Sequence, residues 1–316
     1  MLKYLIIQLT DDAASFCHYE RKSDNGLLIS SETLRDAIFW AMKENLSIQF
    51  IYPDSELSNE YKQIIHSIDH TSIVCAGCRD AQTVANADVV VFSGWDKMEE
   101  AEIKSGISYI LRTSKGELFA NSERLHEFLM HADRLVVVIT DIDKFTIEDC
   151  DNYARMLDSL VPVIREEYRK DHPVQLNLLT DRMFLDGMNN CNAGWESITL
   201  APDGKFYICP AFYLDGGESV GDLQNGLDVR NPQLYRLDHA PICRNCDAWH
   251  CRRCVWLNRK TTLEVNTPSH EQCVVAHLER NASRKLLKSI RELGEFLPGK
   301  EIKAIDYLDP FEIINK

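Results

Sequence analysis

The sequence lacks several features that mark common classes of protein. Its 316 residues include no apolar run of about 18 residues, so no transmembrane helix is predicted. The N-terminus carries no export signal, and no Gly-rich phosphate loop follows a predicted strand. The formal net charge of −14 argues against nucleic acid as the main partner, because phosphate binding needs clustered Lys and Arg. We therefore expect a cytoplasmic protein that binds neither membrane nor nucleic acid.

Basic residues gather in a predicted C-terminal helix. They are Arg280, Arg284, Lys285, Lys288 and Arg291. A charged run of this kind usually forms a solvated helix face, and we expect that here. A binding patch for an acidic partner is the alternative.

The first part of the chain, to about residue 180, alternates predicted strands with predicted helices. The clearest helices are 31–45, which Ser30 or Ser31 can cap, and 146–169. An alternation of this kind predicts a parallel sheet, open or curled into a partial barrel. The predicted strands are a first run at 4–9 and short β-branched runs at 47–51, 71–75, 88–92, 107–111, 134–140 and 174–179.

Cysteine is abundant. The chain has eleven, and seven of them fall between positions 191 and 273. Without an export signal a disulfide framework is not expected, because a reducing cytosol keeps thiols reduced. Dense cysteine in such a chain more often means a bound metal.

The first two of these seven cysteines flank a predicted hairpin. Strand-like runs at 197–200 and 206–208 are joined by Pro202-Asp203-Gly204, a strong turn signal. Such a hairpin would fold Cys191 back toward Cys209.

The other five cysteines follow in a tighter pattern. Cys243 and Cys246 form one Cys-x-x-Cys pair, Cys251 and Cys254 form a second pair four residues later, and Cys273 follows after eighteen residues. Thiolates three residues apart can grip one metal from two sides, in zinc sites and iron–sulfur clusters alike. Seven thiolates suit two sites, one with four ligands and one with three ligands and an open position. The spacing favours iron–sulfur clusters over zinc.

The whole stretch 191–273 resembles the SPASM domain, the auxiliary-cluster domain of radical SAM enzymes that mature peptides and proteins. Val220-Gly221-Asp222-Leu223 resembles the short strand between its two cysteine groups. The last two gaps of the quartet are each one residue shorter than usual. The resemblance implies two [4Fe-4S] clusters, the first held by Cys243, Cys246, Cys251 and Cys273 and the second, with an open iron, by Cys191, Cys209 and Cys254.

A radical SAM enzyme also carries a three-cysteine loop after its first strand, which holds the cluster that binds SAM. Aligned from Leu9-Thr10, the three cysteine positions fall on Ala13, Cys17 and Glu20. The family's Gly-Gly-Glu motif, which contacts the methionine part of SAM, falls on Tyr52-Pro53-Asp54. One thiolate and one carboxylate cannot hold such a cluster. The resemblance therefore implies a radical SAM fold without SAM as cofactor.

The chain as a whole resembles a degenerate radical SAM group called CXXX repeat peptide maturases, with apparent matches at 48–54 and 266–273. The resemblance implies a partial (β/α)6 TIM-like barrel over 1–180, a cysteine-rich SPASM domain with a β-hairpin over 181–275, and a C-terminal helix and tail over 276–316. The implied function is maturation of a ribosomally made, cysteine-repeat precursor peptide. A thiolate of that peptide could bind the open iron.

Two alternatives remain open. The chain could be a non-catalytic scaffold or an electron-transfer partner of an active radical SAM enzyme, which the missing cysteines at Ala13 and Glu20 favour. It could also be a zinc-stabilised binding module. Whether it is an enzyme is left open by the sequence.

Three further residues are candidates for metal or redox chemistry. Cys75-Ala-Gly-Cys78 ends a predicted strand and could be a redox pair or half a zinc site. We expect instead two reduced cysteines without a metal or redox role. His250 could bind or tune a cluster, but four cysteines already complete one ligand set, so we expect a bystander.

Overall fold

The structure is a computed structural model that describes residues 2–20 and 26–302. It divides into two compact units. Unit 1 comprises Met1–Ala101, Ile110–Arg112 and Asn192–Arg236, and unit 2 comprises Glu102–Tyr109, Thr113–Cys191 and Leu237–Lys316. The units interleave along the chain, so the boundaries predicted near 180 and 275 stay a prediction. The tail beyond residue 302 lies outside the described residues.

Unit 1 is built on a sheet in which the strands run β4-β3-β2-β1-β8-β9. Strand β1 (Tyr4–Gln8) pairs in parallel with β2 (Ser47–Ile51) on one side and with β8 (Ser197–Leu200) on the other. Strands β3 (Thr71–Cys75) and β4 (Val89–Phe92) continue the parallel order. The strands are mostly buried, as their apolar sequences require.

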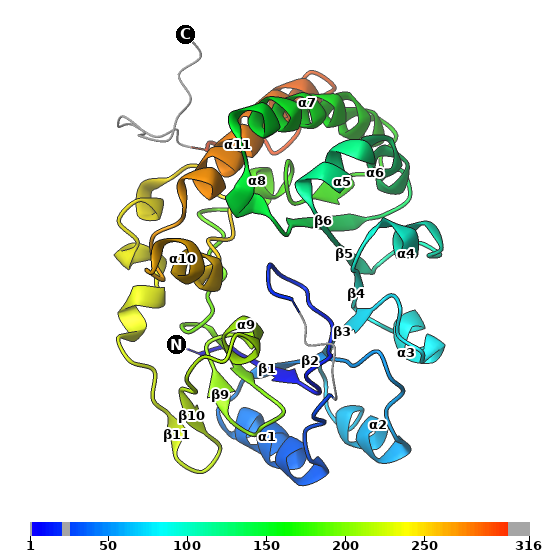
Figure 1. Cartoon of the computed structure of the whole chain (residues 1–316). Coiled ribbons are helices and arrows are strands. Elements are labelled where there is room, and N and C mark those ends of the chain that lie inside the picture. The colour runs from blue at the N-terminus through cyan, green and yellow to red at the C-terminus, as the bar shows by residue number, and fades with distance from the viewer. Residues whose placement is uncertain (1, 21–25, 303–316) are drawn as a thin grey trace. The chain divides into compact units, whose positions relative to one another are not determined.

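Four helices connect the first strands of unit 1. They are α1 (Ser31–Lys43), α2 (Asn59–Ile65), α3 (Ala81–Ala85) and α4 (Trp95–Glu99). The Ser30 hydroxyl accepts a hydrogen bond from the backbone N–H of Thr33 at 3.0 Å, so the predicted cap of α1 is confirmed. Helix α1 contacts both α2 and β2 (Figure 1).

The hairpin predicted around Gly204 is present and belongs to unit 1. Strand β8 pairs antiparallel with β9 (Phe206–Tyr207), and Gly204 takes a φ of +78° in the turn, a conformation that favours glycine. Because β8 also pairs with β1, the hairpin extends the parallel sheet. It is followed by α9 (Pro210–Leu214), the two short strands β10 (Gly221–Asp222) and β11 (Gly226–Leu227), and the 3₁₀ turn η2 (Pro232–Tyr235).

Unit 2 contains two long helices, α7 (Ile147–Arg169) and α11 (His270–Arg291), which pack side by side (Figure 1). The Thr146 hydroxyl caps α7 in a capping box with Asp149. Strand β5 (Ser108–Thr113) contributes residues to both units, while β6 (Arg134–Ile139) and β7 (Gln175–Leu176) pair in parallel within unit 2. The remaining elements are α5 (Lys115–Ala120), α6 (Ser122–Leu129), η1 (Ile142–Lys144), α8 (Asp181–Phe184), η3 (Leu237–His239), η4 (Cys243–Asn245) and α10 (Val255–Thr262).

Strand β7 is shorter than the predicted run 174–179, and side chains explain why. The Asn177 amide bonds to both the N–H and the C=O of Val137, at 2.8 and 3.0 Å. It thereby occupies groups of β6 that a longer backbone ladder would use. The Thr180 hydroxyl accepts from the N–H of Leu176 at 2.8 Å, which turns the chain into α8.

The structure is therefore mixed α/β with parallel strands, as predicted. The partial (β/α)6 barrel and the separate SPASM domain stay predictions. No helix within the described residues combines the length and apolar character that a bilayer crossing requires.

Candidate metal centre

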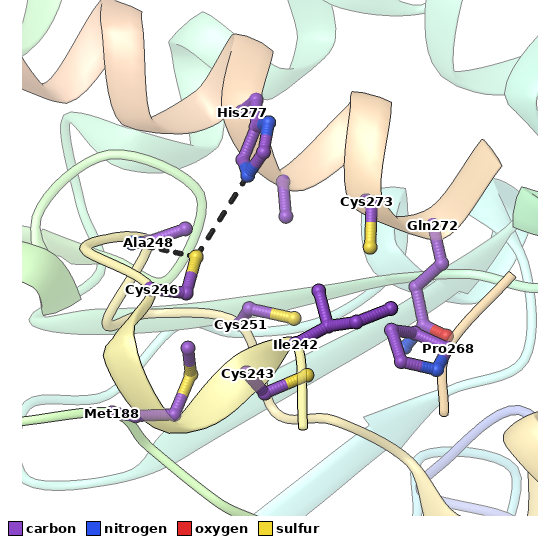
Figure 2. Close-up of a pocket in the computed structure, with 11 residues that line it drawn as sticks. Met188, Ile242, Cys243, Cys246, Ala248, Cys251, Pro268, Gln272, Cys273 and His277 are labelled. Atoms are coloured by element: carbon purple, nitrogen blue, oxygen red, sulfur yellow. Dashed lines mark hydrogen bonds between the residues drawn. The ribbon is translucent and has the colours of Figure 1, made fainter. Parts of the chain in front are cut away.

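The candidate metal centre is a pocket in unit 2 that all four cysteines of the first predicted ligand set line (Figure 2). Figure 2 shows helix α11 above the pocket, with Cys273 and His277 on the side that faces the three other cysteines. Cys243 and Cys273 are buried, and Cys246 and Cys251 are half-buried. The other lining residues are Met188, Ile242, Ala248, Pro268, Gln272 and Ala276.

Local hydrogen bonds fix the loop that carries three of these thiols. The backbone N–H of Cys246 donates to the Cys243 carbonyl at 3.1 Å, which closes the first Cys-x-x-Cys turn. The N–H of Ala248 donates to the sulfur of Cys246 at 3.4 Å. An N–H directed at sulfur favours the thiolate form, which is the form that binds metals.

The fourth thiol comes from a capped helix end. The Ser269 hydroxyl accepts from the N–H of Gln272 at 3.2 Å, so α11 begins at His270 and Cys273 lies in its first turn. One turn later on the same face, His277 places Nε2 3.7 Å from the Cys246 sulfur. The sequence interpretation missed His277, although its spacing of four residues from Cys273 was a usable signal.

A buried carboxylate holds the cysteine loop against two helices. Asp247, next to Cys246, is 2% exposed. Its oxygens lie 3.2 Å from Arg182 of α8, 3.2 Å from Arg280 and 2.5 Å from Arg284 of α11. Arg182 also donates from Nε to the Asp247 carbonyl at 2.8 Å. Burial lowers the pKa of Arg182, and the Asp247 charge opposes that shift.

The prediction of a solvated helix face is wrong for Arg280, whereas Arg284, Lys285, Lys288 and Arg291 are exposed. Arg280 is 2% exposed, and Arg284 keeps 42% side-chain exposure while it pairs with Asp247. The helical spacing predicted their common face, but the buried acid that they meet lies 33 and 37 residues earlier in the chain.

His250 is buried and is not among the residues that line the pocket. Its Nε2 lies 3.0 Å from a Glu279 oxygen, without the alignment of a hydrogen bond. The other Glu279 oxygen accepts from the Tyr153 hydroxyl at 2.5 Å. His250 therefore contacts α11 rather than the thiols that line the pocket.

Burial raises the pKa of two thiols that line the pocket. Burial raises the pKa of Cys243 to about 11, and the charge of Arg253 acts in the opposite direction. Burial also raises the pKa of Cys251, reinforced by Cys243. Thiols of this kind lose their protons when a metal binds. The chemistry of the donors fits a metal–thiolate group: four thiols line one pocket and an N–H is directed at one of the sulfurs.

No single-ion site is pre-formed in the part of the chain that the structure describes, since no three His, Cys, Asp or Glu side chains are placed around one point there. The pocket thus offers the ligands of a metal group without holding them in the geometry of one ion.

The second predicted ligand set is divided between the units. In unit 2, the N–H of Cys191 donates to the Arg252 carbonyl at 2.8 Å and the N–H of Asn189 to the Trp249 carbonyl at 2.6 Å. The segment 189–191 therefore lies beside the loop that ends at Cys254. Cys209 belongs to unit 1, where it precedes α9. The second set stays a prediction.

The loop that carries Ala13, Cys17 and Glu20 lies in unit 1. Ala13 is 2% exposed and Cys17 is half-buried. Arg112 of β5, which is 6% exposed, reaches into this loop. Its Nε donates to the Cys17 carbonyl at 2.8 Å, and its Nη2 donates to the Tyr19 carbonyl at 2.7 Å and to Glu20 Oε1 at 2.8 Å. The Arg112 guanidinium thus ties together the backbone and one side chain of this loop.

We expect Arg112→Met to lower the free energy of unfolding by about 2–3 kcal/mol, because buried carbonyls lose a charged donor. Urea unfolding would measure the change. Arg35→Met is the matched control, since Arg35 is exposed and 3.6 Å from Glu60, and it should cost less than about 1 kcal/mol. Equal effects of the two substitutions would contradict the bracing role.

Cys75 and Cys78 lie at the end of β3 in unit 1. The N–H of Cys78 donates to the Cys75 carbonyl at 2.9 Å in a tight turn. The Cys75 sulfur lies 3.9 Å from the Ser93 hydroxyl. Burial raises the pKa of Cys78, which works against a reactive thiolate.

Solved structures with the same arrangement of elements exist. Native anSMEcpe with bound AdoMet superimposes with a TM-score of 0.61 and 11% identity, over 92% of this chain and 100% of that one. The fold is radical SAM-like. Native anSMEcpe with bound AdoMet and Kp18Cys peptide gives a TM-score of 0.63 at 11% identity, over 92% and 99% of the two chains.

The radical SAM-like fold is as far as these similarities reach, because identities this low show the fold alone. Streptococcus suis SuiB bound to S-adenosylmethionine gives a TM-score of 0.49 at 12% identity, over 86% of this chain and 75% of that one. In sequence, the chain matches no known family profile and no curated protein.

Proposed function

We propose that this chain is an iron–sulfur protein of ribosomal-peptide maturation that binds a cysteine-repeat precursor peptide and acts without cleaving SAM. The observation that carries the proposal is the pocket in unit 2, which Cys243, Cys246, Cys251 and Cys273 line together. These four residues would hold one [4Fe-4S] cluster, and Cys191, Cys209 and Cys254 would hold the second. When bound, the second cluster would offer an open iron to a thiolate of the peptide.

The loop in unit 1 supports a chain that does not use SAM. A cluster that binds SAM needs three thiolates, and two of the three positions are Ala13, which is buried, and Glu20, whose carboxylate pairs with Arg112 at 2.8 Å. Arg112 already satisfies the loop carbonyls that surround Cys17. The radical SAM-like fold of an AdoMet-bound neighbour, solved also with a peptide, supports a peptide as the substrate class.

The test uses the anaerobically purified full chain. We expect no saturable binding of radiolabelled SAM in equilibrium dialysis, and a change in the visible absorption spectrum when a peptide with repeated cysteines is added. In Cys254→Ala that spectral response should disappear. SAM binding at one site per chain, or an unchanged spectrum at saturating peptide, would contradict the proposal.

A second candidate function is a scaffold or electron-transfer partner of an active radical SAM enzyme. The Arg112–Glu20 ion pair favours this candidate, because the pair stabilises the loop at a position where a catalytic cluster would need a cysteine. Co-purification with a SAM-cleaving enzyme, together with a spectrum that does not respond to peptide, would support this candidate. A colourless chain that carries zinc would support the zinc-stabilised binding module instead.

A further inference from the structure

His277 is a buried histidine that lines the same pocket as the four thiols. It lies four residues after Cys273 on α11, so the two side chains share one face of the helix. Figure 2 shows its ring directed at the sulfur of Cys246, with a dashed line for the hydrogen bond between them. The distance from Nε2 to that sulfur is 3.7 Å. A side chain outside the predicted ligand set thus contacts one of the candidate ligands directly.

Two groups from different elements meet at the Cys246 sulfur. The backbone N–H of Ala248 donates to it at 3.4 Å from within the cysteine loop. His277 contacts it from helix α11. The position of this sulfur is therefore defined by both the loop and the helix.

The chemistry of a metal-bound thiolate decides in which direction the hydrogen bond of His277 runs. Such a thiolate has no proton and can only accept, so Nε2 must carry the hydrogen and donate it.

A direct metal ligand is the other role that a histidine in this place could have. It would need the same nitrogen without its hydrogen. However, no three His, Cys, Asp or Glu side chains surround one point in the described part of the chain, and four thiols already complete the ligand set of a [4Fe-4S] cluster. The geometry therefore favours a donor to sulfur over a fifth ligand.

We propose that His277 is a positioning residue of the metal centre: its Nε2–H donates a hydrogen bond to the Cys246 thiolate and raises the reduction potential of a cluster bound in the pocket. Reduction adds one negative charge, which spreads over the sulfurs. A hydrogen bond strengthens as the charge on its acceptor grows, so this donor stabilises the reduced state more than the oxidised state. Hydrogen bonds to the sulfurs are among the factors that set the potential of such clusters.

The inference rests on the proposed function in taking the pocket thiols as cluster ligands. A purely structural role for His277 has different consequences, which two substitutions separate. His277→Gln keeps a side-chain N–H of similar reach but loses the ring, whereas His277→Phe keeps a ring but loses the donor. If the ring only fills space, Phe should replace it better than Gln. If the hydrogen bond matters, the order should be reversed.

The experiment compares the full-length wild type with His277→Phe, His277→Gln and His270→Phe. His270 is the matched control, because it is the same residue type on the same helix, is exposed and does not line the pocket. The reduction potential is measured by anaerobic redox titration of chains loaded with ferrous iron and sulfide. Zinc affinity of the metal-free chains is measured by competition with a chromophoric chelator.

At a potential that half-reduces the wild type, we expect the ratio of reduced to oxidised cluster in His277→Phe to be about 3- to 10-fold lower, the range that one hydrogen bond accounts for. Zinc affinity should fall about 10-fold, as when a partner of a metal ligand is lost. His277→Gln should lie closer to the wild type in both measurements, and His270→Phe should match the wild type. An unchanged potential in His277→Phe, or a larger shift in His277→Gln than in His277→Phe, would overturn the proposal.

A measurement on the wild type keeps the proposal testable if His277→Phe does not fold. With isotopically labelled histidine nitrogen, pulsed electron–nuclear spectroscopy of the reduced cluster should show a weak nitrogen coupling, transmitted through the hydrogen bond, that His277→Gln lacks. No coupling in the wild type, or the strong coupling of a nitrogen bound to iron, would overturn the proposal.

The metal content of the wild type separates this inference from the proposed function. A wild-type chain that carries zinc and no iron contradicts the proposed function, and zinc affinity then tests His277 by itself. Equal zinc affinities of the wild type and His277→Phe would in that case overturn the donor role, and a weaker affinity in His277→Phe that His277→Gln restores would support it.

Discussion

Cys251→Ser should remove one complete cluster from the anaerobically loaded chain. Cys251 lies in the loop between Ala248 and Arg253, and its thiol is one of four that line a single pocket. A serine hydroxyl has nearly the same size but does not ionise at neutral pH, so it cannot replace a thiolate as an iron ligand. The iron content and the inorganic sulfide content per chain should both fall by the amount that one [4Fe-4S] cluster contains.

The matched control for this loss is Cys78→Ser. Cys78 is a half-buried thiol in a Cys-x-x-Cys turn of unit 1, outside the pocket. Its replacement should leave the iron and sulfide contents unchanged. A Cys251→Ser chain that keeps the full iron content would show that the pocket thiols do not anchor a cluster.

Asp247→Asn should be the most destabilising substitution of a single polar residue in unit 2. The change removes the negative charge that Arg182 and Arg280 face while both are buried. Breaking a buried ion pair from one side costs about 3–5 kcal/mol, because the partner charge stays buried without compensation. Arg284 would lose its partner as well, but its exposed side chain can turn to solvent.

Asp158→Asn is the matched control for Asp247→Asn. Asp158 on α7 pairs with Lys285 on α11 at 2.7 Å, and both side chains are about half exposed. Surface pairs of this kind contribute about 0–1 kcal/mol. Urea unfolding of both variants in the metal-free state measures the difference. Similar losses in the two variants would contradict the role assigned to the buried Asp247 brace.

Local signals in the sequence predicted much of the fold. β-branched runs located β2 and β3 to the residue, Ser30 marked the start of α1, and Gly204 marked the hairpin turn. Each of these depends on residues within a few positions of one another, which sequence patterns record. The spacing of Cys243 and Cys246 likewise predicted a tight turn, which the hydrogen bond from the Cys246 N–H to the Cys243 carbonyl closes; metal binding by this turn stays a prediction.

The supports of the candidate site could not be predicted in the same way. Arg112 meets the carbonyl of Cys17 across 95 positions of sequence, and Arg182 meets Asp247 across 65. Single charged residues give no periodic signal, and their usual place is the surface. The burial of Arg253 could not be predicted either, because nothing near it in the sequence indicates a buried charge or the φ of +42° that it adopts.

The iron and acid-labile sulfide content of the anaerobically purified wild-type chain tests the account most directly. The account predicts iron and sulfide in equal amounts, corresponding to two cubanes per chain, that fall by half in Cys251→Ser and stay unchanged in Cys17→Ser. Iron that is lost in Cys17→Ser, or a chain that carries zinc or no metal at the pocket of unit 2, would contradict it.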